Sequence, residues 1–111
     1  MKENAGHDDG LVRELITLFQ DDAPKYLERI RAGAAAGNAR EIEHGAHALK
    51  GSASAVCAAR VSAAALDVEH AARAGDMPAV HALVVTLSER LSELDALLAA
   101  GGLGRTLALA S

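Results

Sequence analysis

The stretch that decides the fold is IEHGAHALKGSASAV, residues 42–56. At about 100° per residue, five of its apolar side chains fall within roughly ±40° of one direction and predict an amphipathic helix. These side chains are Ile42, Ala46, Leu49, Ala53 and Val56. His47 lies about 140° away from Ile42 on the same helical wheel, so we expect an imidazole that faces solvent.

The exposed face around His47 carries further polar groups. The wheel places Glu43, Lys50, Gly51 and Ser54 beside the imidazole. The face therefore combines a candidate nucleophile, a cation and a residue without a side chain. Such a combination favours docking and group transfer.

Two more helices are expected on the N-terminal side of this stretch. Apolar residues recur at helical spacing and predict a short first helix; they are Leu11, Leu15, Leu18 and Phe19. The run Asp21-Asp22-Ala23-Pro24 supplies an N-cap and a proline suited to a first turn, so a second helix is expected to begin there. Gly37 would end that helix, and Asn38 would cap the next one.

On the C-terminal side the apolar pattern changes phase after Val56. Residues 55–60 contain neither Gly nor Pro, but the next apolar positions, Val61 and Val68 among them, are rotated by about 100°, which predicts a turn near 57–60. The run 75–78, Gly-Asp-Met-Pro, predicts a helix stop followed by a restart. The last helix has the most regular apolar stripe, formed by Val80, Leu83, Val84, Leu87, Leu91, Leu94 and Leu98.

These patterns predict an all-α fold: an antiparallel up-down-up-down four-helix bundle with a short extra N-terminal helix across one end. One domain over residues 10–100 is expected, with flexible termini at 1–9 and 101–111. Half of the residues are apolar but only 2% are aromatic, so the core must consist of aliphatic side chains and alanine. Small side chains of this kind let helices pack closely.

Charge and composition exclude several classes of function. The formal net charge is −4 at pH 7, which argues against a nucleic-acid partner or an anionic membrane surface. Cys57 is the one cysteine, so an internal disulfide is excluded, and we expect it to be a buried small hydrophobic residue. No segment reaches the roughly 20 apolar residues of a membrane span.

The stretch that begins at His47 resembles the histidine phosphotransfer (HPt) domains of multistep bacterial phosphorelays. That family has a histidine followed by an apolar residue, lysine, glycine and small residues; here these are His47, Leu49, Lys50, Gly51, Ser52 and Ala53. Further matches are Ala58, Val61, Ala64, Val68, Glu69 and the run 71–76. The resemblance covers roughly residues 10–99. Ser54 and Cys57 depart from it, because the family often has glycine at both positions.

The resemblance implies a phosphoryl carrier without autonomous kinase activity. The imidazole would accept a phosphoryl group from the aspartyl phosphate of a receiver domain and pass it to another receiver aspartate. It implies response-regulator receivers and a hybrid sensor histidine kinase as partners, with Mg²⁺ in the receiver and no cofactor or metal in this chain. We expect a cytoplasmic monomer, alone or as a module of a membrane-anchored kinase. The cognate receivers, the stimulus and the direction of net flow stay open.

The resemblance also implies a role for each residue near the imidazole. His47 would be the phosphoacceptor, Lys50 would stabilise the charge of the phosphoryl group, and Glu69 would orient the ring. The receiver would dock on a face formed by Gly51, Glu43, Ser52 and Ser54. A glycine within a helix costs up to about 1 kcal/mol against alanine, and room for the partner's loops is a reason for that cost.

Two other interpretations compete with the carrier. The spacings Glu41-x-x-His44 and Asp67-x-x-His70 imitate those of di-iron bundles, but both histidines are expected far from the core side of their helices. A non-catalytic interaction module that docks a receiver or kinase through the same face remains the second interpretation.

Overall fold

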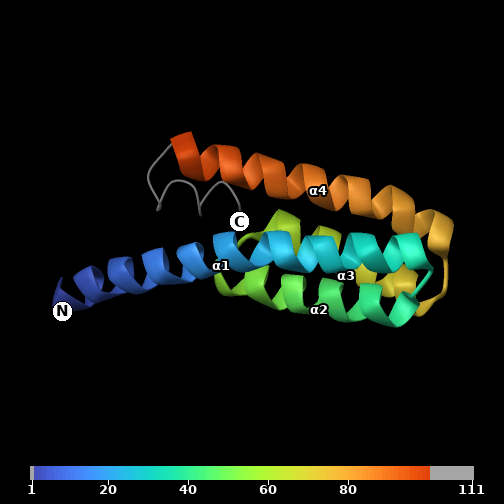
Figure 1. Ribbon diagram of the computed structural model, residues 1–111. Helices are drawn as coiled ribbons and strands as arrows, with labels where there is room; N and C mark the ends of the chain where they lie inside the picture. The colour runs from blue at the N-terminus through green and yellow to red at the C-terminus, as the bar shows by residue number, and fades with distance from the viewer. Residues whose placement is uncertain (1, 101–111) are drawn as a thin grey trace.

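The computed structural model describes residues 2–100, and side chains for residues 10, 11 and 13–99. Four α-helices follow one another along this range: α1 (Lys2–Ala36), α2 (Ala39–Ala55), α3 (Ala59–Arg73) and α4 (Met77–Ala100). Consecutive helices run antiparallel, and α1 also contacts α4, which closes the bundle (Figure 1). The expected all-α, up-down-up-down four-helix fold is confirmed.

The expected break at residues 21–24 is wrong, because α1 is one helix with Pro24 inside it. The separate short N-terminal helix is thus the first half of α1. The buried residues keep a single phase on both sides of the proline; they are Ile16, Phe19, Ala23, Leu27 and Ile30. Leu11 and Leu18 are instead 56% and 57% exposed. The free energy gained by burying one continuous apolar stripe exceeds the cost of the single backbone hydrogen bond that a proline removes from a helix.

Three turns of the same type join the helices. After α2, the Ala58 amide donates to the Ala53 carbonyl and the Cys57 amide to the Ser54 carbonyl, which is the hydrogen-bond pattern of a Schellman motif. The same pattern follows α1 and α3, where Gly37 and Gly75 occupy the left-handed position with φ of 68° and 74°. The turns predicted near 37, 57–60 and 75 are therefore confirmed.

Cys57 occupies the left-handed position that glycine fills in the other two turns. Its φ is 59°, the one positive φ of a non-glycine residue among those described. Its side chain is exposed, so the expectation of a buried small hydrophobic residue is wrong. The left-handed residue of a Schellman motif protrudes from the helix end, which explains the exposure.

The core consists of the apolar stripes that the sequence predicts for α2, α3 and α4. The stripe of α2 is fully buried apart from Val56, which is 6% exposed, and the α4 stripe is buried except at Leu83 and Leu98, which are partly buried. Asn38 caps α2 as predicted, accepting from the amide of Glu41, and Asp76 caps α4, accepting from the amide of Ala79.

Two glycines let α1 and α2 approach closely. A Cβ placed on Gly45 would lie 2.9 Å from Cγ1 of Ile30, and one on Gly33 would lie 2.9 Å from Cγ1 of Ile42. Each glycine thus leaves room for an isoleucine side chain of the other helix. This contact fixes the position of α2, and with it the position of His47.

The expected flexibility of the termini stays a prediction: residues 101–111 lie outside the described residues, and residues 2–9 belong to α1. Between residues 2 and 100, no helix has the length and apolar character needed to cross a membrane.

Candidate functional site

His47 projects into solvent from the middle of α2. Its side chain is 68% exposed, whereas Ala46 and Leu49 on the opposite side of the helix are 0% exposed. Because the core fixes the rotation of α2 about its axis, the imidazole leaves the bundle in one direction. It points toward the seam between α2 and α3, since its ring contacts a residue of α3.

That residue is Glu69, which is 3% exposed and is the one buried polar or charged residue among those described. Its Oε2 lies 3.0 Å from Nδ1 of His47. An ionised carboxylate only accepts hydrogen bonds, so Nδ1 carries the proton and donates it to Oε2. The neutral ring then keeps its lone pair on Nε2, on the side away from Glu69.

Two permanent cations also contact the Glu69 carboxylate. Lys50 Nζ lies 3.2 Å from Oε1, and Arg73 Nη2 donates to Oε2 at 3.0 Å. Burial by itself raises the pKa of Glu69, but the hydrogen bonds and charges of Lys50 and His47 outweigh burial and lower that pKa below its ordinary value. The acid therefore stays ionised near neutral pH, as its role as an acceptor requires.

Arg73 joins this cluster to a second acid. Its Nε donates to Oε2 of Glu43 at 2.8 Å, so the guanidinium spans from Glu43 on α2 to Glu69 on α3. The contacts with Glu43 and Glu69 raise the pKa of Arg73 against a smaller opposing effect of burial. Glu43 is thus engaged by Arg73, whereas the sequence places it on an open docking face.

The remaining residues of the expected docking face differ in their exposure. Gly51 is exposed, and a Cβ built on it would meet no atom within 4 Å beyond its chain neighbours and the adjacent backbone of its own helix. Ser54 is exposed and its hydroxyl lies 2.9 Å from that of Ser62 on α3. Ser52 is half-buried. The open surface next to His47 therefore extends along α2 toward Cys57, over Gly51 and Ser54.

A shallow hollow lies on this open surface, where α2 turns into α3. It has a volume of about 440 Å³ and is lined by Ser54, Cys57, Ala59, Ser62, Ala63 and Leu66. The lining contains no Asp, Glu, Lys, Arg or His. The charged groups Lys50 and Arg73 lie at the other end of the face, around Glu69.

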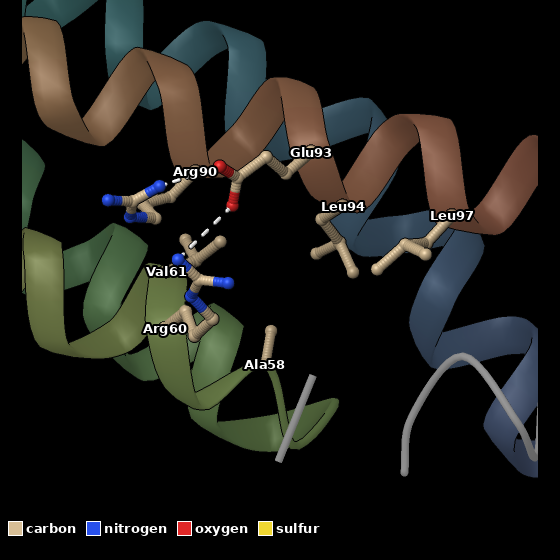
Figure 2. A pocket seen from close by; sticks show the side chains of 7 residues that line it. All are labelled: Ala58, Arg60, Val61, Arg90, Glu93, Leu94 and Leu97. Atoms are coloured by element: carbon tan, nitrogen blue, oxygen red, sulfur yellow. Dashed lines mark hydrogen bonds and ion pairs between the residues drawn. The ribbon is translucent and has the colours of Figure 1, made fainter. Parts of the chain in front are cut away.

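A second cavity lies between the start of α3 and the C-terminal half of α4, away from His47 (Figure 2). Arg60 and Arg90 both pair with Glu93, at 3.6 Å and 2.6 Å, so this one acid offsets only part of their positive charge. The cavity holds about 40 Å³, enough for a few water molecules and too little for a substrate.

The histidines of the metal alternative, His44 and His70, are exposed. Among the residues whose side chains the structure describes, no three of His, Cys, Asp and Glu gather into a group that could hold a metal ion.

The comparison with known families gives one result. The family model described as Hpt domain matches residues 14–100. The chain belongs to the Hpt domain family. No curated protein and no solved structure matches it.

Membership makes the chain a histidine phosphotransfer domain of the kind used in phosphorelays. Hpt domains carry phosphoryl groups and are not kinases, and they interact with receiver domains and kinases. In this Hpt domain, the matched region contains all four helices apart from the first part of α1.

Sequence reasoning missed one member of the site of this Hpt domain. Arg73 has no role assigned from the sequence, although it bridges Glu43 and Glu69. The i,i+4 spacing of Glu69 and Arg73 on α3 was a usable signal for half of that bridge. The other half, from α3 back to Glu43 on α2, depends on the register between two helices, which the sequence does not display.

Proposed function

We propose that His47 is the phosphoacceptor, and that it accepts a phosphoryl group from one receiver aspartate and passes it to another. The observation that supports this most strongly is the contact between His47 Nδ1 and the buried Glu69, on a ring that is otherwise exposed. A ring held at one nitrogen by a fixed acid presents the other nitrogen, Nε2, in a defined direction. The remaining groups of the site support the same role.

The proposed transfer proceeds by attack of the Nε2 lone pair on the phosphorus of the aspartyl phosphate. The N–P bond forms while the bond between phosphorus and the aspartyl oxygen breaks, and the aspartate leaves with that electron pair. The ring keeps its proton on Nδ1 and becomes positively charged. Glu69, already ionised and 3.0 Å away, stabilises this charge. The return step reverses these bonds on a second receiver.

Lys50 has a different proposed role. It is 29% exposed and pairs with Oε1 of Glu69, so it lies one helical turn from the ring without contacting the nitrogen that reacts. A flexible ammonium can leave one acid for the equatorial oxygens of an incoming phosphoryl group. We therefore assign it to charge stabilisation during transfer.

The proposed docking surface is the open face that extends from His47 over Gly51 and Ser54. Gly51 supports it, because the space above this residue is empty and no contact within the bundle requires a glycine there. A protein partner can use that space. The receiver would bring its acidic pocket and Mg²⁺, while this chain, a monomer in the cytoplasm, would supply only the ring and its charged surroundings.

The decisive experiment incubates the chain with phosphorylated receivers and follows the label. We expect one acid-labile, alkali-stable phosphoryl group, which His47→Gln abolishes while the helical circular dichroism stays unchanged. His44→Gln and His70→Gln are matched controls, because both residues are exposed histidines on α2 and α3. Both variants should label like the wild type.

Labelling that persists in His47→Gln would refute the assignment. Stable binding of a receiver without any labelling of the wild-type chain would favour the non-catalytic interaction module instead.

A further inference from the structure

Arg73 and His47 share one oxygen of Glu69. The ring donates to Oε2 at 3.0 Å and the guanidinium donates to the same Oε2 at 3.0 Å. A carboxylate oxygen has two lone pairs, so these two donors complete its acceptor capacity. The charge of Glu69 is consequently divided between the imidazole and a permanent cation.

The far side of Arg73 is fixed as well. Its Nε donates to Glu43, which lies one helical turn before His47 on α2. A guanidinium is a rigid fork with donors in one plane, so a contact at Nε restricts where Nη2 can lie. The planar group therefore approaches Glu69 in an orientation set by the helix that carries the reactive ring.

We propose that Arg73 is a positioning residue for His47: anchored on Glu43, it holds the Glu69 carboxylate in place and limits the negative charge that the ring experiences. The inference rests on the proposed function for its consequence, because the Nε2 lone pair attacks only while the ring is neutral. With Arg73 in place, Glu69 orients the neutral ring. Without it, Glu69 would draw a second proton onto the ring.

The charges that face the ring and its acid come from two helices. From α2 they are Glu43 and Lys50, and from α3 they are Glu69 and Arg73. The formal charges of these two acids and two cations compensate one another around the imidazole. Removing Arg73 leaves one uncompensated negative charge beside the ring, which favours the imidazolium form.

The experiment is an NMR pH titration of the His47 ring in the full chain, with the His47→Gln spectrum identifying its signals among those of five histidines. Arg73→Met should move the titration midpoint of His47 upward by about half a pH unit or more. Arg73→Lys keeps the charge but not the fork, so its midpoint should lie between those of the other two proteins.

A second measurement links the titration to reactivity without a protein partner. Phosphoramidate transfers its phosphoryl group directly to an accessible imidazole, with ammonia as the leaving group. The rising limb of its pH–rate profile should shift upward in Arg73→Met by the same amount as the titration midpoint. A merely structural arginine would change thermal stability and leave both pH values where they are.

The matched control is Arg29→Met. It removes an exposed arginine that pairs with Glu41 across α1 and α2 at 2.7 Å, so the loss of charge is the same and the site is untouched. The titration of His47 should not move in this variant.

A double-mutant cycle with Glu69→Gln separates positioning through Glu69 from direct repulsion by Arg73. The shift caused by Arg73→Met should disappear in the Glu69→Gln background. An unchanged midpoint in Arg73→Met, or an equal shift in both backgrounds, would overturn the inference. Neither result would bear on whether His47 accepts phosphate, since the labelling of His47→Gln decides that separately.

Discussion

Helix α2 packs against α1 on one side and against α3 on the other, and the two junctions differ in how they treat charge and strain (Figure 1). At the junction with α1, Gly37 makes the turn and an exposed pair, Arg29 and Glu41, crosses the surface. At the junction with α3, Cys57 makes the turn in a conformation that favours glycine, and the acid that crosses, Glu69, is buried.

This difference shows where the sequence departs from the residues that would give the fold its greatest stability. At the junction of α1 with α2, a glycine takes the left-handed turn position, glycines lie at the close helix contact, and the ion pair is exposed to solvent. The junction of α2 with α3 has a left-handed cysteine and a buried, ionised acid, and the candidate acceptor contacts that acid. Natural proteins commonly give up local stability in this way at functional sites.

The largest expected effect comes from removing the acids of the two junctions one at a time. Glu69→Ala should lower the free energy of unfolding at pH 7 by about 2 kcal/mol, because it removes charge-assisted hydrogen bonds of a buried group. Glu41→Ala should cause no measurable change, since an exposed pair is screened by water and salt. Urea denaturation of both variants and the wild type measures the difference.

The same pair of acids predicts a dependence on acid pH. The pKa of Glu69 is lowered in the folded state from its ordinary value of 4.5, so its contribution is complete above that pH. As the pH falls through the lower folded-state pKa, the proton binds and that contribution is lost. Glu69→Gln should therefore show a weaker loss of stability below pH 4.5 than the wild type. Equal acid sensitivity in both proteins would contradict the ionised, paired state of this acid.

A smaller effect is expected from the lysine of the α2–α3 junction. Lys50→Ala should slow transfer from a phosphorylated receiver by about tenfold, equivalent to about 1.4 kcal/mol of transition-state stabilisation. Arg29→Ala removes a cation from the other junction and should leave the rate unchanged. Rapid-quench measurement of the transfer step provides the rates, and an unaltered rate in Lys50→Ala would remove its assignment to the phosphoryl group.

The features of the two junctions that depend on the pattern of a single helix could be predicted from the sequence. The rotation of α2 follows from the spacing of Ile42 and Leu49, and it alone places His47 in solvent. The phase change after Val56 likewise reveals a turn without Gly or Pro. The contact between Glu69 and His47 was proposed from the family resemblance, and the structure places the two side chains within hydrogen-bond distance.

The features that could not be predicted depend on how helices meet. The continuity of α1 through Pro24 is decided by its burial against the bundle, which overrides the local signals of a capping aspartate and a proline. The close approach at Gly33 and Gly45 and the bridge made by Arg73 both require the register between neighbouring helices. The pattern of one helix contains no information about that register.

The smallest expected effect concerns the turns themselves. A left-handed conformation costs an L-residue about 1–2 kcal/mol, while glycine loses about 0.5–1 kcal/mol more conformational entropy on folding. Cys57→Gly should therefore raise the free energy of unfolding by about 0.5 kcal/mol. Gly37→Ala places a side chain at the same position of the α1–α2 turn, where the new Cβ has no atom within 4 Å beyond its chain neighbours. The variant therefore isolates the backbone strain and should destabilise the fold. If Cys57→Gly proved no more stable than the wild type while Gly37→Ala lost stability, contacts of the cysteine side chain would have to offset the strain. The α2–α3 turn would then be as well optimised as the α1–α2 turn, and the contrast between the two junctions would rest on the buried acid alone.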